Sequence, residues 1–396
     1  MKLRELFLVG SGSENGARAP NEPGGERKPP TFGEAKNRRQ KARSAGLDPN
    51  YWYPVEYADA LAPGSVREIR FWDASYALYR DVNGDFHAVE NRCAHRQLRL
   101  SIGNVDGCNL VCAYHGWKYD GDGKVVGIGH ELFGHGMPRI RIQARAVKVR
   151  YGLVWVFFGD KERSEGRDVP TIPELEGPSP WPCVPIDFTW KSHHSIIIDN
   201  VSDFTHAYLH RRYQPFSDAK LTDCRPEGDK VFVSYEAKIG QGPIYSLVVD
   251  HVKTNTNKMD LCYEYPFQWS NTDNRIKHHC FVLPIDNRTT RAFFLFYYDP
   301  KTFKVPFLPV AIPPRLLRPM LKLGNAFVVR PLLGEDGIAV EEEQRAYDRH
   351  FEAPMMELNP AIGAFQNLTV RKWDEYLASA EGQKRHGNRD QASATP

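Results

Sequence analysis

The chain has 396 residues, of which 41% are hydrophobic and 26% charged, a globular composition that excludes a collagen-like or largely disordered protein. Its 52 basic and 49 acidic residues leave a net charge of +3, which is too small to provide the broad positive field that binds nucleic acid. Seven cysteines over this length are too few for a disulfide framework. Neither a membrane-spanning apolar run nor a signal-peptide core is visible, so we expect a cytoplasmic protein whose closely spaced Cys and His residues bind metal.

The first part of the chain is predicted to hold a tail and a small β domain. Residues 1–45 are rich in Gly, Pro and basic side chains, which predicts a flexible basic tail. At most a weak helix is expected in it, over residues 32–45. Residues 46–165 contain short apolar or alternating segments separated by turn signals such as Asn83-Gly84, which predicts an all-β domain. The expected strands are 66–72, 76–81, 86–90, 147–149 and 153–158.

A second domain is predicted for residues 166–380, after a proline-rich linker over 161–188, and a polar tail for 381–396. Within this domain a helix over 200–210, a twisted antiparallel sheet and two late helices are expected. The expected strands are 230–239, 244–254, 259–269, 276–284 and 291–298, and the late helices are 339–357 and 359–378. The predicted fold class is therefore α+β, with a small all-β domain followed by a sheet flanked by helices.

Two short segments each offer one thiolate and one imidazole. They are Cys93-Ala94-His95 and Cys112-Ala113-Tyr114-His115, with 16 residues between His95 and Cys112. Facing each other, they supply two sulfur and two nitrogen ligands, which suits either zinc or a 2Fe-2S cluster with two Cys on one iron and two His on the other. Gly116 permits a tight turn and Trp117 can shield the site from water, which favours the cluster.

This pattern resembles the signature of Rieske iron–sulfur domains, Cys-x-His and Cys-x-x-His followed by Gly-Trp, over Cys93–Tyr119. The resemblance implies that the same four residues, Cys93, His95, Cys112 and His115, bind a 2Fe-2S cluster. Ala94 and Gln97 stand where the family often has Pro and Gly, so the first loop departs from the pattern. The additional cysteine pair of respiratory-chain Rieske proteins is lacking, and Cys108 is interpreted as a bystander.

A second polar cluster lies within the predicted helix 200–210. Asn200, Asp203, His206 and His210 follow at steps of 3, 3 and 4 residues, which places them on one helix face. Two histidines four residues apart on a helix can bind one metal ion. A structural His pair is the alternative, but the acid on the same face and the upstream Cys/His motif favour metal binding.

The stripe resembles the mononuclear iron motif of Rieske non-haem iron oxygenases, although the family more often spaces its two histidines by five residues. The resemblance implies that His206 and His210 bind Fe(II) and that Asp203 connects an iron-bound His with the Rieske His of a neighbouring subunit. It also implies a distant carboxylate ligand, for which Asp336 of the Glu335-Asp336 pair is chosen, 126 residues after His210. An acidic helix N-terminus is the alternative interpretation of that pair.

The resemblance extends over about residues 51–377 and implies an oxygenase that uses dioxygen to oxidise an apolar, aromatic or polycyclic small molecule. Monooxygenation, such as hydroxylation or demethylation, is favoured over dioxygenation because nothing indicates a small partner subunit. No Gly-x-Gly-x-x-Gly motif is present, so electrons from NAD(P)H must arrive through a separate reductase, with or without a ferredoxin. The family's electron path between subunits implies a homotrimer.

Residues 301–334 contain six Lys or Arg, six Pro and no acid. Three interpretations remain open for this segment: a lid over the iron site, a peripheral membrane contact, or a helix and loop packed on the sheet. Two alternatives to the oxygenase also remain open. One is a non-catalytic Rieske electron carrier with an added domain, and the other is a zinc protein that uses the Cys/His quartet for structure.

Overall fold

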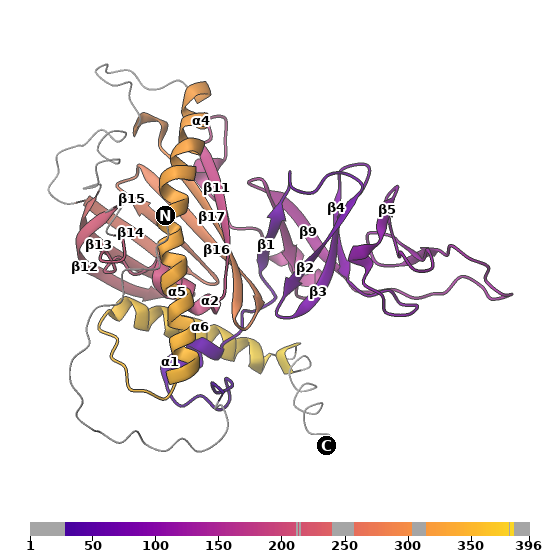
Figure 1. Cartoon of the computed structure of the whole chain (residues 1–396), viewed down its shortest axis with the longest axis horizontal. Helices are drawn as coiled ribbons and strands as arrows, with labels where there is room; N and C mark the ends of the chain where they lie inside the picture. The colour runs from indigo at the N-terminus through magenta and orange to yellow at the C-terminus, as the bar shows by residue number, and fades with distance from the viewer. Residues whose placement is uncertain are drawn as a thin grey trace, which may run out of the picture.

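The computed structural model describes residues 28–210, 213, 215–239, 257–302, 314–379 and 381–383. Strands and short turns make up the first half, and a larger sheet with helices on one face makes up the second half (Figure 1). The predicted α+β class is confirmed. In the part of the chain that the structure describes, no helix combines the length and apolar character needed to cross a membrane.

The small β domain consists of two antiparallel sheets. A six-stranded sheet has the order β1-β10-β9-β4-β3-β2, and a four-stranded sheet has the order β5-β6-β7-β8. The strand bounds are β1 Trp52–Tyr57, β2 Ser65–Phe71, β3 Ala74–Arg80, β4 Phe86–Glu90, β5 Asn104–Asp106, β6 Asn109–Val111, β7 Lys118–Tyr119, β8 Val125–Gly127, β9 Ala144–Arg150 and β10 Leu153–Phe157. The predicted strands of this domain are all present, and the β3–β4 hairpin turns at Asn83-Gly84.

The second domain is built on one seven-stranded antiparallel sheet with the order β11-β17-β16-β15-β14-β13-β12. Its strands are β11 Cys183–Trp190, β12 Phe216–Glu227, β13 Lys230–Ile239, β14 Asn257–Glu264, β15 Phe267–Thr272, β16 Ile276–Asp286 and β17 Thr289–Tyr298. Its helices are α1 Arg38–Ser44, α2 His194–Val201, α4 Pro314–Gly324, α5 Arg330–His350 and α6 Pro360–Ala378. A π-helical turn, Asn325–Val329, joins α4 to α5 without a break, so the two form one long helix across the sheet (Figure 1).

The two domains share one hydrophobic core, because the outer strands of the small domain pack on the large sheet. The Trp155 ring lies edge-on to Phe281, with the centroids 4.9 Å apart. Polar contacts reinforce this junction: Arg291 of β17 pairs with Asp187 at 2.8 Å and with Glu56 of β1 at 3.1 Å. The domains are therefore joined by packing as well as by the chain.

Several predictions from sequence are wrong in this region. The predicted helix over 200–210 ends early, because α2 stops at Val201 and turns follow. The predicted linker over 161–188 ends in strand β11, and the predicted strand 259–269 is two strands that meet at Tyr265-Pro266, where proline cannot continue the ladder. The predicted strand 244–254 lies outside the described residues.

The predicted flexible tail of residues 1–45 is also wrong for its last part, because α1 packs on the second domain. Arg43 is buried and donates from Nη2 to Asp199 of α2 at 2.7 Å and to Glu343 of α5 at 2.9 Å. Its Nη1 donates to Ser195 at 2.9 Å. A buried guanidinium is tolerated only when it is paired in this way, so α1 is part of the folded domain.

Replacing Arg43 with Met keeps much of the side-chain volume but leaves the Asp199 carboxylate buried without its charged partner. We expect Arg43→Met to lower the free energy of unfolding by about 3–5 kcal/mol and Tm by about 10 °C. The exposed Arg225, which pairs with Asp223, is the control, and Arg225→Met should cost at most about 1 kcal/mol. Equal Tm values for the two variants in differential scanning calorimetry would contradict the packing of α1.

Candidate metal centres

The two Cys/His segments form loops with the same backbone pattern. In the first loop Cys93 donates its N–H to Leu98 O and accepts from Gln97 N at 2.8 and 2.9 Å. In the second loop Cys112 makes the equivalent bonds to Trp117 O and from Gly116 N at 2.9 and 3.0 Å. The fifth residue of each loop is left-handed, with φ of +64° at Gly116 and +61° at Gln97. The missing family glycine therefore changes the residue at this turn but not its conformation.

The two thiols lie side by side in the interior of the small domain. Cys93 and Cys112 are 1% and 2% exposed, and burial raises the pKa of the Cys112 thiol. The Tyr119 hydroxyl lies 3.2 Å from Cys93 Sγ and accepts from the Ala94 N–H at 2.9 Å. The bond from Ala94 uses a lone pair of the oxygen and not the hydroxyl hydrogen, which can therefore be donated to the sulfur. A sulfur that receives such a bond is suited to carry the negative charge of a metal thiolate.

The two imidazoles form the outer half of the site. The ring centroids of His95 and His115 are 4.6 Å apart, and Trp117 stacks on His95 at 5.1 Å with the planes 5° apart. His95 Nδ1 is buried and has no hydrogen-bond partner among the described residues. A buried nitrogen of this kind costs free energy unless something binds it, and a metal would satisfy it. The donor set therefore fits a cluster with two thiolates and two imidazoles.

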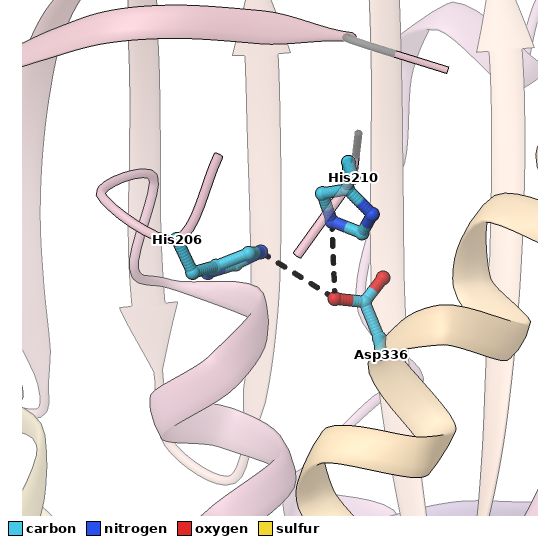
Figure 2. Close-up of side chains that lie close together, drawn as sticks. All are labelled: His206, His210 and Asp336. Atoms are coloured by element: carbon cyan, nitrogen blue, oxygen red, sulfur yellow. Dashed lines mark ion pairs between the residues drawn. The ribbon is translucent and has the colours of Figure 1, made fainter. Parts of the chain in front are cut away.

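A second group of ligands lies against the large sheet. His206 Nε2 and His210 Nε2 lie 3.4 and 3.3 Å from Asp336 Oδ1 (Figure 2). The nearest ligand atoms of these three residues are all within 4.8 Å of one another. Two imidazoles and one carboxylate on one side of a metal form the facial triad of non-haem iron sites, which leaves positions open for dioxygen.

Turns, rather than a helix, bring the two histidines together. After α2 ends, Leu209 N donates to His206 O at 2.9 Å and His210 N donates to Ala207 O at 3.1 Å. The two ring centroids are 5.2 Å apart, and both rings contact Phe216 edge-on. The two histidines of the predicted stripe thus do lie close together, but turns and not a helix bring them there. Asp336 reaches them from the middle of α5 (Figure 2).

Electrostatics distinguish the two adjacent acids of α5. Burial would raise the pKa of Asp336, but hydrogen bonds and charge from His206 and His210 outweigh it and lower the pKa. Burial would likewise lower the pKa of His210, yet Asp336 and Glu335 raise it. Glu335 Oε2 lies 3.0 Å from His210 Nδ1, the ring nitrogen that faces away from Asp336. Asp336 thus lies where it could bind a metal together with the two histidines. Glu335 lies where it can orient His210, a role the sequence analysis missed.

Asp203 does not make the contact expected from its place in the stripe. Its Oδ1 accepts from the backbone and hydroxyl of Thr205 at 2.9 and 2.7 Å and from Asn359 at 3.0 Å. Among the described residues no hydrogen bond joins it to His206. Asn200, instead, donates to Asp336 at 3.4 Å. The expected hydrogen bond between Asp203 and an iron-binding histidine is therefore not made within one chain, because the helix that would align the two residues ends at Val201. The role of Asp203 between subunits stays a prediction.

Asp203 and His206 both line a groove of about 660 Å³. Its other walls come from α1, α2, α5, the 351–357 segment and α6. Of the three candidate metal ligands, His206 is the one that lines this groove. An acid and a candidate ligand histidine therefore share one groove.

Comparison with known proteins identifies both domains. Residues 51–131 match the family profile of the Rieske [2Fe-2S] domain, and residues 190–380 match that of the vanillate O-demethylase oxygenase C-terminal domain. The chain is 46% identical over 347 residues to 4beta-methylsterol monooxygenase of Methylococcus capsulatus, covering 87% of this chain and 93% of that protein. The iron–sulfur subunit of the toluene-4-sulfonate monooxygenase system of Comamonas testosteroni is 32% identical, over 41% of this chain and 46% of its own length.

A solved structure shares the fold. The crystal structure of dicamba monooxygenase bound to dicamba superposes with a TM-score of 0.68 at 18% identity, over 85% of this chain and all of that one. The chain therefore belongs to the Rieske non-haem iron oxygenases. Within that family it is a monooxygenase, with a Rieske 2Fe-2S domain and a catalytic domain that binds mononuclear iron.

Tyr119 provides a test of the cluster site. We expect Tyr119→Phe to lower the reduction potential of the cluster, because it removes a hydrogen bond that stabilises negative charge on the Cys93 sulfur. Tyr114→Phe is the control, since that side chain is 56% exposed and no hydrogen bond joins it to either cysteine sulfur among the described residues. Redox titration followed by electron paramagnetic resonance measures the reduction potential of the cluster in both variants. The same potential in both variants would argue against Cys93 as a ligand.

Asp336 and Glu335 provide a test of the mononuclear site. Asp336→Ala should lose the mononuclear iron and keep the visible absorption of the cluster. Glu335→Gln should keep the ligand set and weaken iron affinity by about 10–100-fold, because His210 loses its orienting acid. Glu342→Ala, an acid 64% exposed at its side chain on the same helix, is the control. Iron analysis after dialysis against a chelator decides, and retention of iron by Asp336→Ala would exclude it as a ligand.

Proposed function

We propose that this protein inserts one oxygen atom into a methyl group of a lipophilic polycyclic molecule of the 4-methylsterol type. The observation that carries the proposal is the 46% identity with 4beta-methylsterol monooxygenase over nearly the whole length of both chains. The catalytic sheet supports an apolar substrate, because its ligand histidines contact Phe216 and its strands carry Phe188, Trp190, Phe294 and Phe296 in mutual ring contact.

In this proposal Cys93, His95, Cys112 and His115 hold the cluster, and His206, His210 and Asp336 hold the iron. The bound iron supplies the dioxygen chemistry. Glu335 accepts a hydrogen bond from His210 Nδ1–H, which leaves the lone pair of Nε2 directed at the metal position. Asn200 steadies Asp336, and the aromatic side chains exclude water from the reacting carbon.

Electron transfer between subunits is the second part of the proposal. The loops with the Cys/His motif lie at one end of the chain and the α5 site at the other (Figure 1). We infer that the Cys/His loops of a neighbouring copy insert into the groove that Asp203 and His206 line, with Asp203 as the connecting acid. A head-to-tail contact repeated in this way closes as a ring, and a homotrimer is the family's form. The electrons come from NAD(P)H through a separate reductase, with or without a ferredoxin.

The function is tested by single turnover of the reduced, iron-loaded protein with a 4-methylsterol under ¹⁸O₂. The expected result is a product that carries one labelled oxygen atom, detected by mass spectrometry. Dicamba and toluene-4-sulfonate serve as comparison substrates, since relatives at lower identity or coverage are named for them. Labelled product from an aromatic acid but none from the sterol would overturn the substrate class and retain the monooxygenase.

Asp203 tests the electron route. Asp203→Asn keeps the shape and removes the charge, so both metal sites should stay loaded while reoxidation of the reduced cluster slows by about 100-fold. Glu357→Gln is the matched control, because Glu357 lines the same groove without lying in the motif and should reoxidise at the normal rate. Stopped-flow absorbance with substrate and dioxygen measures the rate. If both variants reoxidise alike, or if Asp203→Asn loses iron, the bridging role is wrong.

A further inference from the structure

The outer face of α4 and the π turn carries an apolar stripe that no described residue covers. Leu316, Leu323 and Phe327 are 63%, 60% and 69% exposed, and together they are called the outer stripe below. They recur at steps of seven and four residues, which places them along one side of the long helix. Three large apolar side chains side by side at this exposure are more than the scattered surface residues of a typical soluble protein.

The stripe does not result from a loosely placed helix. The opposite side of α4 is anchored by Leu317 and Leu321, which are buried against Val184 and Tyr298 of the sheet. Leu317 is 1% exposed. A helix fixed by its inner side and apolar on its outer side has two separate hydrophobic faces, and only one of them is used within this chain.

The charged side chains of the segment that carries the stripe are all positive. No Asp or Glu occurs between Lys301 and Gly334. Arg318 and Lys322 are exposed, one turn apart, and form no ion pair with any residue that the structure describes. They line a groove of about 620 Å³ whose other side includes Tyr151 and Trp181. Uncompensated cations beside aromatic side chains suit the phosphate level of a lipid surface.

We propose that α4 docks on an anionic lipid bilayer, with the outer stripe in the acyl boundary and Arg318 and Lys322 at the headgroup phosphates. Exposed apolar side chains and basic side chains on one short helix are the two signals that interfacial helices combine. Nothing acidic in this segment opposes an anionic surface. The Asp203 groove lies near α1 and α6, at the far end of α5 from α4 (Figure 1), so membrane docking leaves it free for another subunit.

The position of the stripe shows what membrane docking would do for catalysis, an argument that rests on the proposed function. The same long helix carries Phe327 and Asp336, nine residues apart along the chain, which at ~1.5 Å per residue is about 13 Å. A sterol-like substrate partitions into bilayers, so a protein seated there meets its substrate close to the iron site. Vesicle binding itself does not require the iron chemistry, and the two can fail independently.

The test uses the full-length, iron-loaded protein and two kinds of vesicle: phosphatidylcholine alone, and phosphatidylcholine mixed with phosphatidylglycerol. Wild type should sediment with the mixed vesicles, less so with phosphatidylcholine alone, and less at high salt. L323E/F327E and R318E/K322E should each weaken binding to the mixed vesicles by at least about tenfold. The control V82E/V149E changes two residues, 57% and 52% exposed on the small domain, and should bind as wild type does.

Four outcomes overturn the proposal. Wild type that stays in the supernatant with mixed vesicles shows that no such surface exists. Binding that survives both α4 variants, or that is lost equally in V82E/V149E, places the contact elsewhere. If L323E/F327E changes the oligomer mass by light scattering, the stripe is a contact between copies of this chain. Turnover of a detergent-dispersed sterol by a variant that no longer binds vesicles separates docking from catalysis.

Discussion

The catalytic domain depends on placing one ionised carboxylate beside two imidazoles in a largely buried position. Asp336 is 6% exposed, and burial alone would favour its neutral form. The two histidines reverse that preference, and a metal ion would reverse it more strongly. His206 and His210 come from turns after α2, whereas Asp336 comes from α5, so the site exists only when both elements are packed on the sheet. The buried Arg43 of α1, which contacts α2 and α5, helps fix that packing.

In the Rieske domain, the candidate metal ligands are positioned by two short loops. Two loops of the same backbone pattern each present a Cys and a His, and the chain needs a left-handed residue at the fifth position of both. Gly116 adopts this conformation without cost, while Gln97 adopts it at a cost of about 1 kcal/mol, which the surrounding bonds offset. The shared core and the Arg291 contacts then hold this domain rigidly to its own sheet. The position of the Cys/His loops relative to the catalytic sheet is therefore fixed by packing within one chain.

One helix links the parts of the catalytic domain that matter for substrate. The continuous helix from α4 to α5 carries the outer stripe at one end and Asp336 and Glu335 in its middle, with a π turn between them. A π turn interrupts the regular α-helical spacing between the two parts. Both parts nevertheless bury side chains in the domain: Leu317 and Leu321 in α4, and Leu333, Asp336 and Val340 in α5. Asn325 within this turn is buried, and its Oδ1 has no partner among the described residues.

The sequence by itself determined the chemistry that lies close along the chain. Each Cys/His pair sits within a single loop, so its spacing indicated a metal site, and the resemblance to Rieske domains indicated a cluster. The strand patterns predicted most of both sheets, because alternation depends on local burial. The tertiary structure decided what depends on distant contacts. It ended α2 at Val201, placed α1 in the domain through Arg43, and turned Asp203 toward Asn359. It also gave Asp336 and Glu335 different positions around His210. Which nitrogen of the ring each of two adjacent acids reaches is set by the rotation of a packed helix, and no local pattern records that rotation.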